Sequence, residues 1–391
     1  MIRLSDASSW ICRYVADHPV LLDELLDLRS ILVPLNKEEL FEELHRKLLH
    51  LPEKDDEGRI IALREFKQAQ VLKVAAADLY GYLPLPKVSD HLTVVAEVMI
   101  SSCVNMAWAQ MISRYGASSH FTPDAPPGFG VIAYGKLGGY ELGYGSDLDL
   151  VFVYDEEISP HVGTLSAPEF YGRLARHVIS LITTMTPAGT LYQVDLRLRP
   201  SGDSGLLVTS LAALRNYQLQ NAWTWEQQAL IKARLVLGDD QIRKAFDAIR
   251  IESLSRSRNP DELLDEILSM RAKMLSTKPP SQDAHFNVKL DKGGIVDIEF
   301  LVQFGVLLTA NRDPKVTQWT DVSRLLEVLA RSNFLTLMEA GRLREIYFLF
   351  RSESHAASLQ EREPLVFDGR FEKERSEVKA IWAKVMEHPT H

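Results

Sequence analysis

The stretch Gly145-Ser146-Asp147-Leu148-Asp149-Leu150 places two carboxylates at the start of an apolar run. That run is rich in Val, Phe and Tyr, so we predict a strand from Leu148 to Tyr154. Alternation along a strand places Asp147 and Asp149 on one face and the leucines on the other. Neighbouring carboxylates repel each other, and a divalent cation such as Mg²⁺ offsets that repulsion. Taken alone, the pattern also fits a solvated strand end with aspartates in a turn.

A glycine-dense segment lies just before this strand. The apolar run Phe129 to Tyr134 predicts another strand, and seven of the 21 glycines fall between Gly128 and Gly145. In Tyr134-Gly135-Lys136-Leu137-Gly138-Gly139, backbone N–H groups are able to meet phosphate oxygens. The segment is neither a Walker A loop nor a dinucleotide-binding fingerprint, because it lacks the spacing of both. We predict a phosphate-binding turn whose contacts are Gly135, Lys136, Gly145 and Ser146.

A third carboxylate, Asp195, lies in a further alternating stretch. Residues Leu191 to Leu198 predict a third strand, on which Asp195, Arg197 and Arg199 share one face. One interpretation is a salt-bridged polar face of a sheet. The other is a third metal ligand or base, beside arginines that bind phosphates bidentately. We favour the second, because two-metal chemistry needs a third carboxylate. The predicted catalytic and metal-binding residues are Asp147, Asp149 and Asp195.

Two later stretches permit a functional and a structural interpretation. Trp223 to Arg234 predicts an amphipathic helix, whose Lys232 and terminal arginine would reach a triphosphate or form a solvated face. Lys289 to Phe300 predicts a glycine-rich turn that leads into a helix. Its acidic residues, Asp297 and Glu299, are typical of side chains that complement a helix dipole. We count Lys232 among the candidate nucleotide-binding residues, together with the two arginines of the third strand.

The bulk composition is that of a globular chain. Its 391 residues are 46% hydrophobic and 25% charged, so two to three domains are expected. The net charge of -9 argues against a nucleic-acid binder. The two cysteines, Cys12 and Cys103, lack the spacing of a disulfide scaffold or a zinc site, which favours the cytoplasm. We find no run of about 18 apolar residues and no signal peptide, so we expect no membrane contact.

The order of the predicted elements divides the chain into three regions. Residues 1–117 are expected to be helical, residues 118–250 to form an α/β catalytic domain, and residues 251–391 to form a helical bundle. The predicted fold class is therefore α+β and mostly helical, with a small mixed sheet. Asn36 and Glu39 form a capping-box pattern at the start of one helix. Further helices are expected at 56–80, 89–116, 168–184, 261–276, 295–310, 323–331, 336–358 and 371–386.

These motifs resemble a known family. The strands with GSDLDL and VDLRLRP resemble the polymerase-β-type nucleotidyltransferases, which implies a core of that fold. More closely, nearly the whole chain resembles the glutamine synthetase adenylyltransferases. The longest matching motifs are YGKLGGYELGYGSDLDLVFVYD (134–155), LYQVDLRLRPSGDSGLLVTS (191–210), WTWEQQALIKAR (223–234) and KGGIVDIEF (292–300).

The resemblance implies an activity and its cofactors. It implies ATP as co-substrate and two Mg²⁺ ions, with Mn²⁺ as an alternative. It also implies transfer of AMP to a tyrosine of glutamine synthetase, with release of pyrophosphate, when nitrogen is plentiful. Regulation by the PII signal protein and by glutamine belongs to the same resemblance. Each of these statements is an expectation for this chain.

The resembled family carries two related catalytic units. One removes AMP from glutamine synthetase by phosphorolysis, and the other attaches it. LPLPKVSDHLT (83–93) and RLRPSG (197–202), with Ser201 where the removing unit has a bulkier residue, resemble the C-terminal attaching unit. We therefore expect a C-terminal fragment of a longer polypeptide. The alternatives are the removing reaction, which gives ADP, uridylyl transfer to PII by a related enzyme, and a catalytically dead module that binds PII and glutamine.

Overall fold

The computed structural model describes residues 8–19, 21, 34–52, 55–116, 126–158, 165–276, 285–367 and 369–387. The chain forms two compact units. The first unit contains Met1–Gln220 and Ala233–Ile249, and the second contains Asn221–Lys232 and Arg250–His391. The three sequence regions remain a prediction, because one compact unit is able to hold more than one region. Each unit is described by itself.

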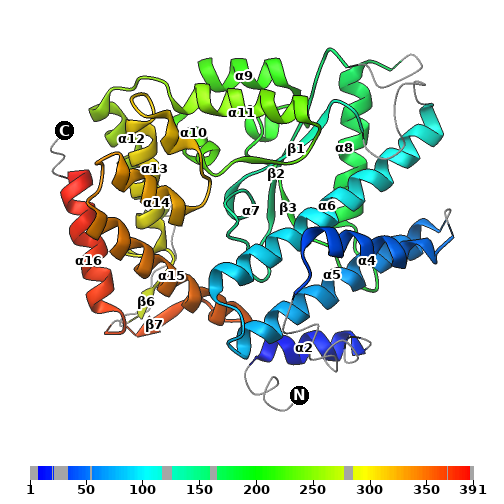
Figure 1. Cartoon of the computed structure of the whole chain (residues 1–391), viewed down its shortest axis with the longest axis horizontal. Helices are drawn as coiled ribbons and strands as arrows, with labels where there is room; N and C mark the ends of the chain where they lie inside the picture. Colours follow the sequence, from blue (N-terminus) through cyan, green and yellow to red (C-terminus); the bar gives the residue numbers. More distant parts are fainter. Residues whose placement is uncertain are drawn as a thin grey trace. The chain divides into compact units, whose positions relative to one another are not determined.

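Helices form the first part of the first unit (Figure 1). They are α2 (Ser9–Asp17), α4 (Lys37–Leu49), α5 (Asp56–Leu79) and α6 (Leu85–Tyr115). The capping box of Asn36 and Glu39 is confirmed, since each side chain accepts a hydrogen bond from the other residue's backbone N–H. Among the described helices, only α6 is long and apolar enough to cross a membrane, and 78% of its most apolar window is buried inside the protein. It therefore packs as a core helix.

A mixed sheet lies at the centre of the first unit. Its strands are β1 (Phe129–Ala133), β2 (Leu148–Tyr154), β3 (Val194–Asp195), β4 (Val208–Ser210) and β5 (Arg234–Leu237). The order is β3-β2-β1-β5, and β4 also pairs with β2. Strand β2 is antiparallel to β1 and parallel to both β3 and β4. All of its residues except Asp149 are buried, which explains why its near-continuous apolar sequence predicted it correctly.

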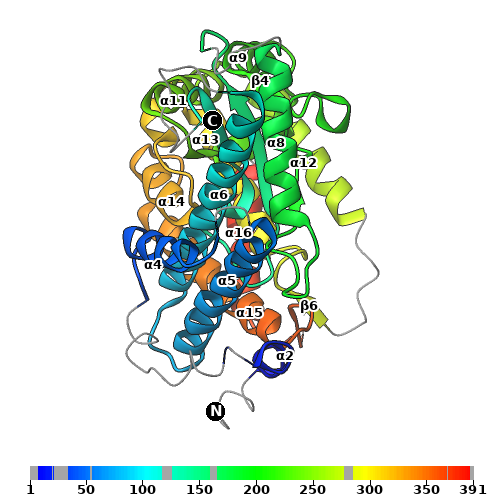
Figure 2. The same cartoon turned by 90° about the vertical axis from the view of Figure 1, so that its right-hand side faces the viewer.

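The remaining helices of the first unit pack around this sheet. They are α7 (Gly135–Gly138), α8 (Ala167–Thr183), α9 (Leu211–Gln220) and most of α11 (Asp240–Leu254). Helices α6 and α8 lie side by side (Figure 2). Tyr171 of α8 stacks on Phe129 of β1 and on Tyr154 of β2, with ring centroids 5.7 and 5.2 Å apart. This aromatic cluster fixes α8 at the end of β2 that is farther from Asp149.

Two sequence predictions were wrong in extent. The strand predicted for Leu191–Leu198 covers only Val194–Asp195, because the Asp195 carboxylate accepts the N–H of Arg197 and the chain turns there. The helix predicted for Trp223–Arg234 ends at Ile231, and Arg234 begins strand β5 instead. In both cases hydrogen bonds formed on folding interrupt a local pattern.

The second unit is a helical bundle, as predicted. Its elements are α10 (Thr224–Ile231), α12 (Pro260–Ser276), α13 (Ile295–Thr309), η3 (Pro314–Thr317), α14 (Val322–Arg331), α15 (Leu337–Leu359), α16 (Glu372–Trp382) and η4 (Ala383–Glu387). A small antiparallel pair, β6 (His285–Asn287) and β7 (Leu365–Phe367), accompanies them. Helix α13 is buried along most of its length and packs against α12, α14, α15 and α16. The prediction of an α+β, mostly helical fold is confirmed.

Candidate active site

The sheet brings Asp149 and Asp195 together. In the parallel pairing of β2 with β3, Leu148 lies opposite Val194 and Asp149 lies opposite Asp195. Asp147 immediately precedes β2 and is exposed. Burial, followed by the charges of Asp147 and Asp195, raises the pKa of the Asp149 carboxyl to about 6. The three predicted carboxylates are therefore close enough to repel one another.

Two cations reduce this repulsion. Lys136 and Arg197 both act to lower the pKa of Asp149, against the larger effects of burial and of the other two carboxylates. Arg197 also binds Asp195 through two nitrogens, since its Nε donates to Oδ1 at 3.0 Å and to Oδ2 at 2.9 Å, and its Nη2 donates to Oδ2. These hydrogen bonds lower the pKa of the Asp195 carboxyl. Asp195 is consequently a weak base while Arg197 is bound to it.

The donor set fits a hard divalent cation. Asp149 is a largely buried carboxylate beside two others, and carboxylate oxygens are the ligands that Mg²⁺ prefers. Over the described ranges, no three acidic, histidine or cysteine side chains converge tightly enough to hold a metal. At this site the Asp195 carboxylate is occupied by hydrogen bonds from Arg197. Metal binding by Asp147, Asp149 and Asp195 therefore stays a prediction.

The glycine-rich turn is built around Asp149. The N–H of Tyr134 donates to the backbone carbonyl of Asp149 at 2.9 Å. Gly135 has a φ of +55°, and a Cβ there would overlap Oδ2 of Asp149. A glycine at this position is needed for the close approach of a carboxylate as well as for the backbone conformation. Lys136, the next residue, is exposed and starts the single turn of α7 with Gly135.

Gly145 and Ser146 form the second turn of the site. Gly145 is exposed with a φ of +69°, and nothing lies within 4 Å of the position that a Cβ would take. The hydroxyl of Ser146 accepts the N–H of Gly143 at 3.1 Å, and its own N–H donates to the Gly143 carbonyl at 3.2 Å. Ser146 thus stabilises the turn that presents Gly145. Contact of either residue with a phosphate stays a prediction.

Gly135→Ala is expected to weaken Mn²⁺ binding by about 10–100-fold, because the new methyl group displaces the Asp149 carboxylate. Gly145→Ala is the matched control, since it has a similar φ of +69° and room for a Cβ. Both substitutions introduce left-handed strain of about 1–2 kcal/mol. Titration of Mn²⁺ followed by electron paramagnetic resonance measures the difference. Equal losses in the two variants would show that backbone strain, and not the carboxylate contact, accounts for the effect.

Arg234 and Glu97 support the glycine-rich turn, and sequence reasoning had assigned no functional role to Glu97. Arg234 donates to the carbonyls of Gly138 and Leu137, at 3.1 and 3.0 Å. It is ion-paired with Glu97 of α6, which is only 6% exposed and also binds Lys37. Arg234 therefore holds the turn, instead of forming the solvated face considered above. The sequence did contain a signal for this contact, namely a glutamate within the most apolar helix. A charge buried in such a helix is normally paired with an opposite charge.

Arg199 organises a neighbouring turn. Its guanidinium donates to the carbonyls of Leu196, Asp203 and Gly205, at 2.8, 3.0 and 3.3 Å. These contacts close the segment that follows β3 and includes η2 (Gly202–Ser204). Alternation along a longer strand had placed Arg199 on the same face as Asp195. The structure instead places it in the turn, and its contact with a phosphate stays a prediction.

Lys232 lies in the second unit and is engaged there. It is 7% exposed, and its Nζ lies 2.6 Å from Oε1 of Glu299. Asp297, in the first turn of α13, is also buried and forms an ion pair of 2.6 Å with Arg271. Asp297 and Glu299 are therefore both ion-paired within the bundle, which the helix-dipole interpretation did not predict. A role for Lys232 in nucleotide binding stays a prediction.

Comparison with known proteins relates both parts of the chain to nucleotidyltransferases. A family model described as glutamate-ammonia ligase adenylyltransferase matches residues 1–249. A second model, described as PII-uridylyltransferase, matches residues 268–375. A bifunctional glutamine synthetase adenylyltransferase/adenylyl-removing enzyme of Methylococcus capsulatus is 46% identical over 396 residues. That alignment covers 100% of this chain and 42% of the relative, so the chain spans less than half of the relative's length.

Proposed function

The chain belongs to the glutamate-ammonia ligase adenylyltransferase family, and on this basis we propose that it transfers AMP from ATP to a tyrosine of glutamine synthetase, with release of pyrophosphate. The observation that carries the proposal is the pairing of Asp149 with Asp195 across β2 and β3, with Asp147 one residue before β2. This arrangement supports a metal-dependent nucleotidyl transfer. Mg²⁺ is the proposed cation, and Mn²⁺ is the alternative.

The proposed reaction makes one bond and breaks one. The tyrosine oxygen attacks the α-phosphorus of ATP, and the bond from that phosphorus to the bridging oxygen breaks as pyrophosphate leaves. The tyrosine hydroxyl has an unperturbed pKa of about 10, so it must lose its proton during the attack. Bound cations would lower that pKa and neutralise charge on the phosphates. Most of the acceleration is expected from positioning and charge stabilisation.

The residues of this chain have distinct proposed roles. Asp147 and Asp149 would hold the cations, and Asp195 would contribute a third carboxylate ligand. Proton acceptance by Asp195 requires that Arg197 first withdraws, because the bidentate contact lowers the pKa of that carboxyl. Arg197, once released, would bind a phosphate oxygen. The backbone N–H groups of Gly135 and Gly145, with Lys136, are the further proposed contacts of the triphosphate.

The direction of the reaction is part of the proposal. The name of the Methylococcus relative covers both attachment and removal of AMP. The RLRPSG motif favours attachment, and its Ser201 adopts a left-handed φ of 63°. A small residue is tolerated there more readily than a bulky or β-branched one. The removing reaction remains the alternative.

The proposal extends to regulation and location. The match of residues 268–375 to a PII-uridylyltransferase family supports a relation to PII signalling, and we propose PII and glutamine as regulators. We propose the cytoplasm as the location, since the burial of α6 accounts for its apolar sequence without a membrane. The net charge of -9 favours a protein substrate over a nucleic acid.

Incubation with Mg²⁺, ATP labelled at the α-phosphate and unmodified glutamine synthetase tests the proposal. Label on a tyrosine is the expected result, and no transfer with glutamine and PII present would contradict it. A parallel reaction with adenylylated glutamine synthetase and phosphate detects the removing activity by its product, ADP. A third reaction, with labelled UTP and PII, detects uridylyl transfer. Formation of ADP in the second reaction, without AMP transfer in the first, would assign the removing activity. Label on PII in the third reaction alone would assign uridylyl transfer.

A further inference from the structure

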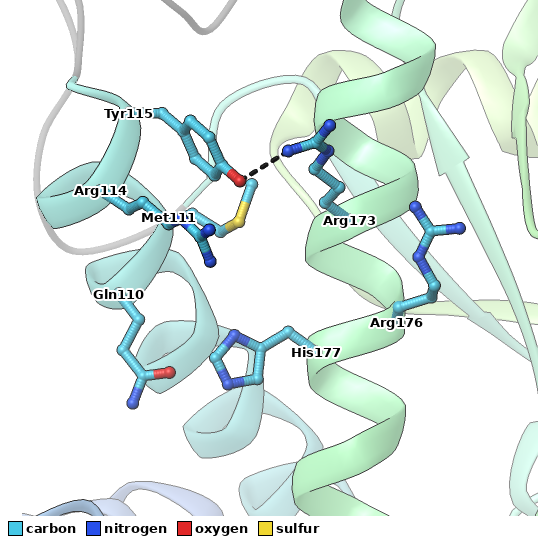
Figure 3. Close-up of a pocket in the computed structure, with 7 residues that line it drawn as sticks. All are labelled: Gln110, Met111, Arg114, Tyr115, Arg173, Arg176 and His177. Atoms are coloured by element: carbon cyan, nitrogen blue, oxygen red, sulfur yellow. Dashed lines mark hydrogen bonds between the residues drawn. The ribbon is translucent and has the colours of Figure 1, made fainter. Parts of the chain in front are cut away.

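A basic hollow of about 440 Å³ lies between α6 and α8 in the first unit (Figure 3). Helix α6 contributes Gln110, Arg114 and Tyr115 near its C-terminal end, and α8 contributes Arg173, Arg176 and His177. Figure 3 shows Arg114 and His177 directed toward the space between the two helices and Arg173 directed toward Tyr115, whereas Arg176 lies on the side of α8 that faces away from α6. The volume lies within the range of small-molecule sites, which is about 300–1,000 Å³.

Helical periodicity explains why the charges gather here. Gln110 and Arg114 are four residues apart on α6, and Arg173 and His177 are four apart on α8, so each pair lies on one helix face. The two faces meet because α6 packs along α8. Three arginines thus line one hollow of a chain whose net charge is -9. Like charges held close together destabilise a surface unless an anion offsets them.

Among the described residues, two acidic side chains, Glu169 and Asp56, interact with residues that line the hollow. No carboxylate is among the described residues that line it. Glu169, one turn before Arg173, interacts with that arginine, but its carboxylate accepts hydrogen bonds from the N–H and hydroxyl of Ser166. The charge of Asp56 on α5 acts to raise the pKa of the His177 imidazole, against the larger lowering by burial. The hollow therefore keeps an excess of positive charge.

Tyr115 holds one of the arginines in place. Nη1 of Arg173 lies 2.6 Å from the Tyr115 hydroxyl, which accepts its hydrogen bond (Figure 3). The guanidinium carbons of Arg114 and Arg173 each lie 5.4 Å from the centroid of the Tyr115 ring. The negative end of the α6 dipole would by itself favour a cation at the position of Arg114, in the last turn of that helix. That explanation does not extend to Arg173 and Arg176, which lie within α8.

We propose that this hollow binds a small ligand that bears two or more phosphate groups. Guanidinium groups bind phosphate oxygens through paired hydrogen bonds, and three arginines from two helices line this hollow. Gln110 adds an amide, which is able to donate to a further oxygen. The site is separate from the three carboxylates. Tyr171, beside the arginines on α8, stacks on Tyr154 at one end of β2, whereas Asp149 lies near the other end.

Calorimetric titration of the full chain with pyrophosphate, in buffer stripped of divalent cations, tests the proposal. One equivalent is expected to bind, and Arg173→Gln/Arg176→Gln is expected to weaken binding by about tenfold or more. Arg173→Lys/Arg176→Lys keeps the charge but loses the bidentate geometry, so we expect an intermediate affinity. Because both arginines are exposed, thermal unfolding of the variants should match that of the unchanged protein. This measurement separates lost binding from lost folding.

Three controls make the result decisive. Arg46→Gln removes an exposed arginine of α4 outside the hollow and should leave binding unchanged. Asp149→Asn should also leave it unchanged, because metal-free binding at this hollow does not involve the carboxylates. Binding that Asp149→Asn alters and Arg173→Gln/Arg176→Gln does not would overturn the assignment. So would the absence of saturable binding, or citrate binding at least as tightly as pyrophosphate.

Discussion

Asp149→Asn is expected to lower AMP transfer by about 10³-fold or more, while making the metal-free protein more stable above pH 6. Removal of a metal ligand forfeits several kcal/mol of charge stabilisation in the transition state. The gain in stability has a separate origin. Asp149 is a largely buried carboxylate beside Asp147 and Asp195, and its ionisation is unfavourable without a cation.

The sign of the pH effect follows from the pKa of Asp149. Burial and the two neighbouring carboxylates raise it from 3.8 to about 6. The folded protein therefore holds this proton in a range where the unfolded chain has lost it. Between about pH 4 and 6 the free energy of unfolding falls as pH rises, and the loss is complete above about pH 6. Asparagine has no charge to desolvate, so the variant should gain on the order of 1 kcal/mol at pH 8 and little at pH 4.

Urea unfolding at pH 4 and pH 8 in chelated buffer measures this difference, and labelled AMP transfer measures activity. Asp147→Asn is the matched control, because its carboxylate is exposed. It should lose activity like Asp149→Asn but gain less stability, through relief of its repulsion with Asp149. Full activity in Asp149→Asn would refute the metal-site assignment. Equal stability gains in the two variants would refute the burial argument instead.

The sequence predicted where Asp147 and Asp149 lie because local patterns determine strand β2, and metal binding by this pair stays a prediction. Strand β2 is buried on both faces, so its apolar run could be read directly, and Asp149 is its one partly exposed residue. The structure also places Asp195 opposite Asp149, since β3 pairs with β2 at that position, and its role in the site stays a prediction. A short alternating pattern was sufficient here, even though β3 has only two residues.

The surroundings of that pair could not be predicted in the same way. Arg234 reaches the turn at Gly138 across 96 positions of sequence, and the pairing of β5 with β1 places it there. Glu97 comes from a third element, α6. The turn after β3 depends on the contact of Asp195 with Arg197, a competition between side chain and strand that periodicity does not register. The residues around the carboxylate pair could not be predicted because their positions depend on contacts between segments that are distant in the sequence.

Asp297→Ala is expected to lower the free energy of unfolding of the second unit by about 3–5 kcal/mol. Arg271 and Asp297 are both almost fully buried, with Nε and Oδ1 2.6 Å apart. Asp297 also accepts the N–H of Gly293 at 2.5 Å, and Arg271 donates to the Leu290 carbonyl at 2.9 Å. Loss of the carboxylate would leave a buried guanidinium without its counter-charge and the Gly293 N–H without its acceptor.

Hydrogen exchange of peptides from α12 and α13, together with urea unfolding of the whole chain, measures this effect within the second unit. Glu327→Ala is the control, because Glu327 and its partner Arg344 are 45% and 42% exposed. This substitution should change the free energy of unfolding by less than about 1 kcal/mol. The double variant Arg271→Met/Asp297→Ala should recover part of the loss, because no unpaired charge remains buried. If the double variant is as unstable as Asp297→Ala, the unpaired charge is not the cause. The Gly293 hydrogen bond, which both variants lack, would then account for the loss, and the pair would serve chiefly to hold the turn before α13.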